Sequence, residues 1–319
     1  MKNQTRPVLT LLLFCCGLGG WQAVAAQVPP TRTDTARLSR HLRYLTRTPQ
    51  PRNAAHPIVL DSVAAYLSQE LEKVAPGRVR EQGYAVDGHY YRNIIADFGP
   101  TVGPILVVGA HYDVCGEQPG ADDNGTGVAA LLELARQLGA AGPALRQPVE
   151  LVAYTLEEPP YFRTKNMGSY RHAALMKSVQ APVRGMVALE MLGYYDDRRG
   201  SQHYPIGPLK FIYGSRGNYV TVAQKFGNGR FGRRFARQYR QAAGLPVKRF
   251  KAPAWLPGID FSDHLNYWKF GYPAVLLTDT AFYRNRSYHQ TTDTLARLDM
   301  RRLGLAVDAL TATVLAGGF

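Results

Sequence analysis

The stretch Ile105–Leu138, ILVVGAHYDVCGEQPGADDNGTGVAALLELARQL, decides the fold. It opens with the apolar run Ile105–Gly109, which predicts a buried strand, and it ends with the helical apolar spacing of Val128–Leu138. A polar loop joins the two and carries His111 and three aspartates, Asp113, Asp122 and Asp123. Because open α/β sheets place their sites at the carboxyl ends of strands, this loop is the candidate site.

The side chains of this loop indicate metal binding. A neutral imidazole such as that of His111 is a good zinc ligand, and the carboxylate of Asp123 is suited to bridge two ions. Asp113 stands two residues after His111 and is suited to accept the second ring N–H, which would fix the tautomer. The alternative is a satisfied loop histidine followed by an aspartate that caps the helix. This stretch alone leaves both interpretations open.

The composition is that of a globular protein without a nucleic-acid partner. The chain has 319 residues, of which 45% are hydrophobic. No internal repeat or low-complexity linker divides it, so we expect a single domain. The 38 lysines and arginines exceed the 24 aspartates and glutamates, which gives a net charge of +14. These basic residues are dispersed, and no nucleic-acid module is recognisable. The segment 225–251 includes a predicted basic helix that begins at Lys225, which we interpret as a solvated face, with attraction of acidic peptides as the alternative. We interpret the charge as a solvated surface.

Residues 1–26 have the pattern of a secretory signal peptide. Lys2 and Arg6 precede an apolar run at 8–18, and small residues follow at 23–26. The run is too short to be a persuasive membrane span. We therefore expect residues 27–319 to be the mature domain, in the periplasm or outside the cell, with no stable membrane span.

The cysteines give little structural information. Cys15 resembles a lipid-attachment residue, but the bulky Phe14 before it argues against lipidation. Cys15 and Cys16 would leave with the signal peptide, so the mature chain retains Cys115 and has no internal disulfide. We interpret Cys115 as a small loop residue rather than a nucleophile, because no histidine is paired with it in the sequence.

The remaining apolar patterns predict an α/β fold. Helices are expected near 36–45 and 59–74, and two strands, 78–86 and 90–98, form a hairpin with Gly88 in its turn. The hairpin would give the sheet an antiparallel edge. A further strand at 149–156 completes a right-handed βαβ unit with 105–109 and 128–138. The prediction is one domain with a mixed, mostly parallel twisted sheet and helices on both faces.

Three further polar positions follow or interrupt predicted strands. Glu157 and Glu158 end the strand at 149–156, and such a pair can supply one metal ligand and one general base, or can be solvated loop acids. Glu190 interrupts the apolar run Met186–Tyr195 and needs a cation, strong donors or exposure at the strand end. His289 lies between a strand at 273–278 and a last helix predicted at 295–315.

Together these pieces resemble the co-catalytic zinc aminopeptidases of clan MH, which include bacterial leucyl aminopeptidases and glutamate carboxypeptidase. The resemblance runs in order from about Tyr90 to Leu315. The matching motifs are HYD at His111, GADDNGTG at Gly120, LEEPPYF at Leu156, ALEMLGYY at Ala188, FSDHLNYWKFGYPAVLLTDT at Phe261 and YHQTTDT at Tyr288. It implies the zinc-exopeptidase fold, which is phosphorylase/hydrolase-like, and residues 27–319 as its catalytic domain.

The resemblance also implies roles for single residues. Two Zn²⁺ ions would be held, one by His111 and Glu190, the other by Glu158 and His289, with Asp123 bridging them. Glu157 would be the general base, and Asp113 would orient His111. The family often has aspartate where this chain has Glu190, which supplies the same donor atoms from a longer side chain. Asp263 and His264 match a family motif, but the sequence assigns them no role.

The function implied is a secreted zinc aminopeptidase that acts on peptides with a free N-terminus, with Glu157 activating a metal-bound water. Alternatives are a glutaminyl-peptide cyclotransferase, a carboxypeptidase or dipeptidase, and a non-catalytic binding relative. The complete set of ligand positions argues against the last. Candidates for a specificity pocket are residues 193–195 and Trp255 with Leu256, which could equally be core. The sequence carries no signal for oligomeric state.

Overall fold

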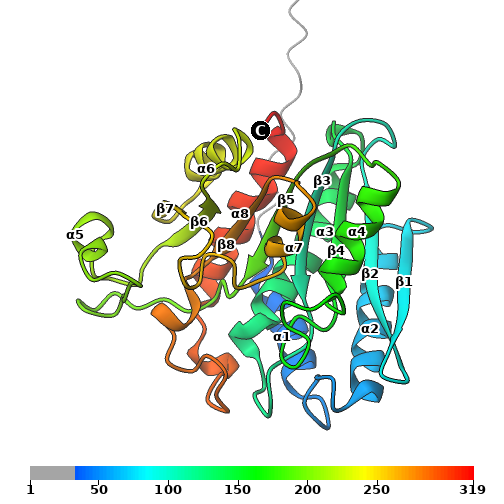
Figure 1. Ribbon diagram of the computed structural model, residues 1–319, viewed down its shortest axis with the longest axis horizontal. Helices are drawn as coiled ribbons and strands as arrows, with labels where there is room; N and C mark the ends of the chain where they lie inside the picture. Colours follow the sequence, from blue (N-terminus) through cyan, green and yellow to red (C-terminus); the bar gives the residue numbers. More distant parts are fainter. Residues whose placement is uncertain (1–32) are drawn as a thin grey trace, which may run out of the picture.

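A computed structural model describes residues 33–319, so the expected signal peptide, residues 1–26, lies outside the described part of the chain. The described residues form a single α/β domain around one eight-stranded sheet with the order β1-β2-β4-β3-β5-β8-β6-β7 (Figure 1). The strands are β1 (Val79–Val86), β2 (His89–Phe98), β3 (Ile105–His111), β4 (Val149–Tyr154), β5 (Val183–Glu190), β6 (Val220–Lys225), β7 (Val247–Ala252) and β8 (Ala274–Thr278).

The pairing of the strands confirms the predicted mixed sheet. β1 and β2 form the expected antiparallel hairpin, and β2 continues antiparallel to β4. The central strands β4, β3, β5 and β8 are parallel to one another. β3, the following helix and β4 form the expected βαβ unit. β6 then pairs antiparallel with β8 and carries β7 at the far edge.

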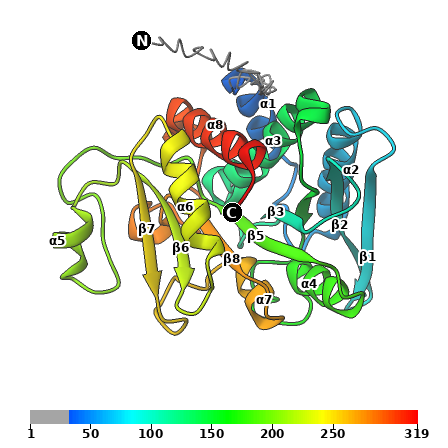
Figure 2. The same ribbon diagram turned by 90° about the horizontal axis from the view of Figure 1, so that it is seen from above.

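Helices cover the two faces of the sheet unequally. In Figure 2 the long helices lie on one side, whereas α4 and α7 lie on the other, and α5 projects beyond β7. The helices are α1 (Thr35–Thr46), α2 (Pro57–Glu72), α3 (Gly127–Ala141), α4 (Gly168–Ser178), α5 (Leu209–Tyr213), α6 (Phe231–Ala242), α7 (His264–Lys269) and α8 (Met300–Ala316). In residues 33–319 we find no helix with the length and apolar character needed to span a bilayer.

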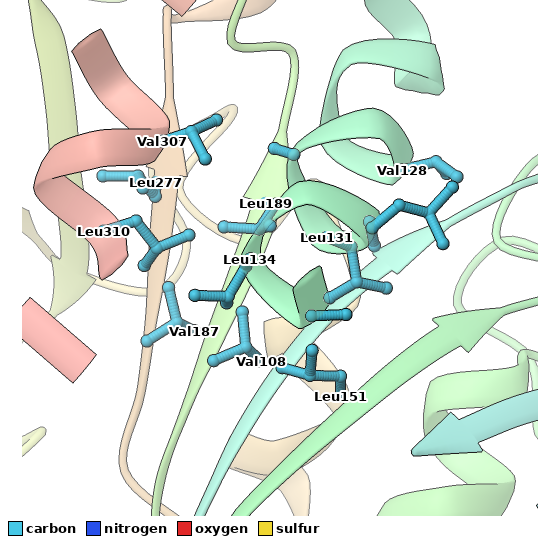
Figure 3. Packing of buried hydrophobic residues seen from close by; sticks show 14 of the residues in the cluster. Val108, Val128, Leu131, Leu134, Leu151, Val187, Leu189, Leu277, Val307 and Leu310 are labelled. Atoms are coloured by element: carbon cyan, nitrogen blue, oxygen red, sulfur yellow. The ribbon is translucent and has the colours of Figure 1, made fainter. Parts of the chain in front are cut away.

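The main core lies between the sheet and the long helices. Figure 3 shows Val108, Val187 and Leu277 on neighbouring strands packed against α3 and α8. Alternate residues of the same strands face the other way, because side chains alternate along a strand. This second face has a smaller apolar cluster under α4 and α7. Its remaining area, at the carboxyl ends of β3 and β5, carries the candidate site.

The structure corrects three details of the predicted elements. The last helix begins at Met300 instead of Leu295, because the Asp299 carboxylate caps it by accepting the Arg302 N–H, and a short 3₁₀ turn precedes it. Lys225 ends a strand and is not part of the basic helix. Glu190 does not interrupt a longer strand; it is the last residue of β5. Strands β6 and β7 were not predicted.

Candidate metal centre

The structure gathers all seven site residues that the sequence singled out at one edge of the sheet. His111 and Glu190 are the last residues of β3 and β5. Glu157 and Glu158 follow β4, and His289 lies in the loop between β8 and α8. Asp123 lies in the tight turn before α3, and Asp113 in the loop that leads to it. Adjacent parallel strands end at the same edge, so short loops suffice to bring these side chains together.

Asp123 occupies the middle of the cluster. Its Oδ1 lies 3.7 Å from His111 Nε2, and its Oδ2 lies 3.3 Å from His289 Nε2. Glu190 Oε2 is 3.2 Å from the same His111 nitrogen, and Glu158 Oε2 is 3.3 Å from the same His289 nitrogen. The cluster therefore consists of two imidazole–carboxylate pairs with one carboxylate between them.

Glu157 faces this cluster without belonging to either pair. Its Oε2 lies 3.8 Å from His111 Nε2, further than Glu190. The side chain is buried and lines the same cavity as both histidines. Glu157 is thus placed beside the two pairs, where it can meet a molecule held between them.

The turn that carries Asp123 depends on backbone constraints at both of its ends. Gly120 has φ 63°, and a Cβ there would come within 2.5 Å of the Asp123 carbonyl oxygen, so only glycine fits. The carboxylate of Asp293 accepts the backbone N–H groups of Asp122 and Asp123 at 3.0–3.1 Å. Arg52 is buried beneath the turn and donates to the carbonyl of Gly120. Asp293 comes from the YHQTTDT motif, and this anchoring role was not predicted.

Asp113 acts mainly on the loop of the two glutamates. Its carboxylate accepts the backbone N–H groups of Glu157 at 3.1 Å and Glu158 at 3.0 Å. His111 Nδ1 is 3.2 Å from the main-chain carbonyl of Asp113 and 3.6 Å from its carboxylate. The ring of His111 is therefore oriented chiefly by a backbone oxygen, and the Asp113 side chain positions the neighbouring carboxylates.

The cluster carries an excess of carboxylates, which cations would stabilise. Burial and the neighbouring Asp123 charge raise the pKa of Glu158 to about 7. Burial opposes charge on His289, yet the adjacent carboxylates of Asp123 and Glu158 raise its pKa to about 10. Burial likewise raises the pKa of Glu157 well above its usual range. Protons are held here because carboxylates outnumber positive groups, and a metal ion would offset the same excess.

Two atoms of the cluster fit the role of metal ligands directly. Glu158 Oε1 and His289 Nε2 are buried and make no well-aligned hydrogen bond within residues 33–319. His289 Nε2 faces the Asp123 Oδ2 and Glu158 Oε2 oxygens at 3.3 Å, and mixed nitrogen and oxygen donors are the chemistry that zinc prefers. Donor atoms of His111, Asp123 and Glu190 lie within 4.8 Å of one another, as do those of His111, Glu157 and Glu158. The residues present fit a pair of divalent cations.

Of the other sequence candidates, Asp263 and His264 lie outside the cluster, whereas the Cys115 Sγ lies within 4.8 Å of donor atoms of Glu158 and His289. Asp263 is buried beside it, with no hydrogen-bond partner for its carboxylate within the described residues, and burial raises its pKa to about 7. His264 points away, with Nε2 2.8 Å from the Ile259 carbonyl, and burial lowers its pKa to about 4. Cys115 is half-buried near Glu158 and His289, and burial raises the pKa of its thiol to about 11.

A cavity of about 280 Å³ opens from the cluster. It lies at the lower end of the range for small-molecule sites. The predicted pocket residues do not line it: Trp255 is 78% exposed, and Leu256 and residues 193–195 lie outside the lining. The wall opposite the glutamates consists instead of residues from the loops around α5 and from β6 and β7, among them Tyr204, Tyr213, Tyr219 and Lys248. Sequence reasoning missed this wall because the two short strands were not recognised.

The fold and the cluster together define an α/β protein with a candidate two-metal centre at the carboxyl edge of its sheet. The chain belongs to the Peptidase family M28, whose sequence profile matches residues 93–314. Membership confirms the resemblance to the clan MH peptidases that the motifs indicated. It makes the chain a member of a metallopeptidase family.

Two comparisons of sequence place the chain more closely. It is 42% identical over 289 residues to the uncharacterized protein YfbL of Escherichia coli (strain K12), and the match covers 88% of each protein. It is 26% identical over 255 residues to leucine aminopeptidase 1 of Ajellomyces capsulatus (strain NAm1 / WU24). That match covers 74% of this chain and 59% of the fungal protein.

Solved structures show the same fold. The LapA aminopeptidase of Legionella pneumophila superposes with a TM-score of 0.70 at 19% identity, covering 88% of this chain and 71% of LapA. A glutaminyl cyclase of Bacteroides thetaiotaomicron, bound to N-acetylhistamine, superposes with a TM-score of 0.67 at 17% identity. That match covers 90% of this chain and 99% of the cyclase. The fold is therefore shared by proteins named for two different reactions.

Proposed function

We propose that this protein is a secreted, metal-dependent aminopeptidase that hydrolyses the first peptide bond of peptides with a free N-terminus. The observation that carries the proposal is the central position of Asp123 between the His111–Glu190 and His289–Glu158 pairs. A single carboxylate in contact with two imidazole–carboxylate pairs is the arrangement that two adjacent metal ions require.

In this proposal five side chains hold two Zn²⁺ ions: His111, Asp123, Glu158, Glu190 and His289. When bound, such ions lower the pKa of a coordinated water and polarise the scissile carbonyl. Ser262 donates to Glu190 Oε2 at 2.7 Å, and Gln118 donates to Asp123 Oδ2 at 3.3 Å. These donors fix the orientation of the two carboxylates.

Glu157 performs the proton transfers. Its carboxylate takes a proton from the attacking water and returns it to the amine that leaves as the peptide bond breaks. Asp113 holds the main chain of Glu157 in place through the N–H bond described above. The buried position excludes bulk water, which strengthens the interactions of every charge in the site.

The relatives support hydrolysis at the N-terminus, and the basic, apolar start of the chain supports secretion. The fungal protein named leucine aminopeptidase matches 74% of this chain in sequence. The cyclase likeness is one of fold alone, so cyclisation of N-terminal glutamine is the second candidate.

The test is turnover of a panel of aminoacyl-nitroanilides and one peptide with N-terminal glutamine, with and without a chelator and added zinc. Chelator-sensitive release from free-amino substrates, with no release from N-acetylated ones, is the expected result. Ammonia release from the glutamine peptide alone would replace the proposal by the cyclase. Cleavage from the carboxyl end of N-blocked peptides would replace it by a carboxypeptidase.

A further inference from the structure

The cavity beside the metal centre has a floor made of four strands in register. Glu190 pairs with Thr278, Thr278 with Thr221, and Thr221 with Lys248, across β5, β8, β6 and β7. All four residues line the cavity, so they lie in one row on the same face of the sheet. The row begins at a candidate metal ligand and ends at a lysine.

The row sets the distance between the two ends of the cavity. Neighbouring strands lie about 4.8 Å apart, so three steps separate the Cα atoms of Glu190 and Lys248 by about 14 Å. An extended peptide advances about 3.4 Å per residue, so the span between these Cα atoms corresponds to roughly four residues, and the gap is shorter between side-chain ends that extend into the cavity. The floor between the ends is nearly uncharged, since the next row consists of Leu276, Ala223 and Phe250.

Lys248 carries a charge that no carboxylate offsets. Its ammonium donates to the Tyr213 carbonyl and lies 3.5 Å from the centre of the Tyr219 ring. Among residues 33–319 it forms no ion pair, and the charged group that acts on it is another cation, Arg284. Arg284 lies 4.8 Å from the same ring. A half-buried cation of this kind is available to an anion from outside the chain.

The pKa of Lys248 agrees with a cation that has no anionic partner. Burial and the Arg284 charge lower the pKa of its ammonium to about 8. The groups around it are Arg284, the Tyr213 carbonyl, and the Tyr219 hydroxyl, which hydrogen-bonds Tyr204. A carboxylate placed here would relieve the repulsion between the two cations.

We propose that Lys248 binds a carboxylate of the substrate, so that the site selects short peptides that carry a negative charge at the far end of the cavity. The proposal rests on the peptidase function in naming the ligand a peptide. The carboxylate has two possible sources, the C-terminus of a tri- or tetrapeptide and the side chain of an acidic first residue.

The experiment uses two matched pairs of substrates on the zinc-loaded full chain. The first pair is Leu-Gly-Gly as free acid and as amide, and the second is Glu-Gly-Gly-amide and norleucyl-Gly-Gly-amide. The quantity measured is the ratio of kcat/KM between the charged and the neutral member of each pair. Because a charge-assisted hydrogen bond is involved, we expect wild type to favour the charged member of one pair roughly 10-fold to 100-fold.

The variants Lys248→Met and Lys248→Arg test the residue. Lys248→Met should bring that ratio close to one, and Lys248→Arg should restore most of it because the charge returns. Lys251→Met is the matched control, because Lys251 lies three residues along β7 on the opposite face and is exposed. It should leave the ratio at the wild-type value. The pair that responds identifies the source of the carboxylate.

A binding measurement separates this proposal from the peptidase assignment. Calorimetric titration of the same peptides into zinc-loaded Glu157→Gln protein, with and without Lys248→Met, requires no turnover. If wild type releases no amino acid, the peptidase proposal fails. The role of Lys248 is still supported if the charged peptide binds with higher affinity than the neutral one and Lys248→Met abolishes the difference. Equal binding and equal turnover of both members in both pairs, or a ratio unchanged in Lys248→Met, overturns the inference.

Discussion

The Asp113 carboxylate accepts the backbone N–H of Glu158 at 3.0 Å, and that of Glu157 at 3.1 Å. One buried side chain at the end of β3 therefore fixes the main chain of two functional residues at the end of β4. The hydrogen bonds connect the loops of two adjacent parallel strands. The distance between Glu157, the proposed general base, and the candidate metal-binding carboxylates depends on this link.

Replacement of Asp113 should weaken metal binding. Asp113→Ala leaves two buried N–H groups without acceptors and releases the Glu157–Glu158 loop. Because changes of this kind around metal ligands typically cost 10-fold to 100-fold in affinity, we expect a loss of about that size for zinc. Competition with a chromophoric chelator measures it. Asp61→Asn, at an exposed position, is the control, and unchanged affinity in Asp113→Ala would contradict the positioning role.

Glu157→Gln should separate chemistry from metal binding. The amide keeps the shape of the side chain but cannot accept the proton of water, so kcat should fall roughly 10²-fold to 10⁴-fold with KM little changed. Zinc content, measured by atomic emission, should equal that of wild type. Glu117→Gln, in the exposed part of the same site loop, is the control. A loss of zinc together with activity would show that Glu157 is a ligand instead of the base.

The two imidazoles should bind separate ions. In His111→Ala and in His289→Ala we expect the bound zinc to fall from two ions to one, whereas Asp123→Ala should lose both because its carboxylate contacts each pair. Metal analysis after dialysis provides the count. If Asp123→Ala retains both ions, Asp123 does not bridge them.

Stability should fall in acid through His41. Burial lowers the pKa of His41 to about 4, and its Nδ1 bonds the Tyr66 hydroxyl. Between pH 6.5 and 4 the unfolded chain binds a proton that the folded chain excludes, so the free energy of unfolding decreases as the pH falls through this window. At pH 4.5 the loss due to this group is on the order of 2 kcal/mol.

Urea unfolding of wild type and His41→Gln at pH 7.5 and pH 4.5 measures this contribution. The variant should lose less stability between the two pH values than wild type. His89→Gln, at an exposed histidine of β2, should show the wild-type dependence. Identical pH dependence in all three proteins would exclude His41 as the cause.

The sequence predicted the central part of the fold because its signals there are local and strong. The apolar run of β3 and the helical apolar spacing of α3 are each long enough to predict the element without knowledge of its tertiary contacts. The hairpin at Gly88 was marked by its turn residue. The last helix was extended too far, to Leu295, because apolar spacing does not show where Asp299 begins a new cap.

The outer part of the sheet could not be predicted for a physical reason. β6 and β7 are six residues each, and β7 (VKRFKA) has basic residues at three positions, which resembles a solvated segment. β6 is held by pairing with β8, which is distant in sequence, and β7 pairs in turn with β6. Because β6 and β7 were not predicted, the sequence did not indicate Lys248 or the far wall of the cavity either. The motifs did locate the seven side chains that gather at the candidate metal centre, because metal chemistry would restrict their types and order.

The antiparallel pairing of β6 with β8 has a consequence for how specificity can change. The candidate metal ligands are supplied by the turn before α3, by the ends of β3 and β5, and by the loops after β4 and β8. The far wall of the cavity belongs instead to residues 202–261, between β5 and β8. Within the described sheet, that segment pairs with the parallel strands only through β6, along β8, whereas its helix α6 packs into the main core. A chimera that exchanges it for the same segment of a relative would alter the far wall of the cavity without replacing any of the candidate metal ligands.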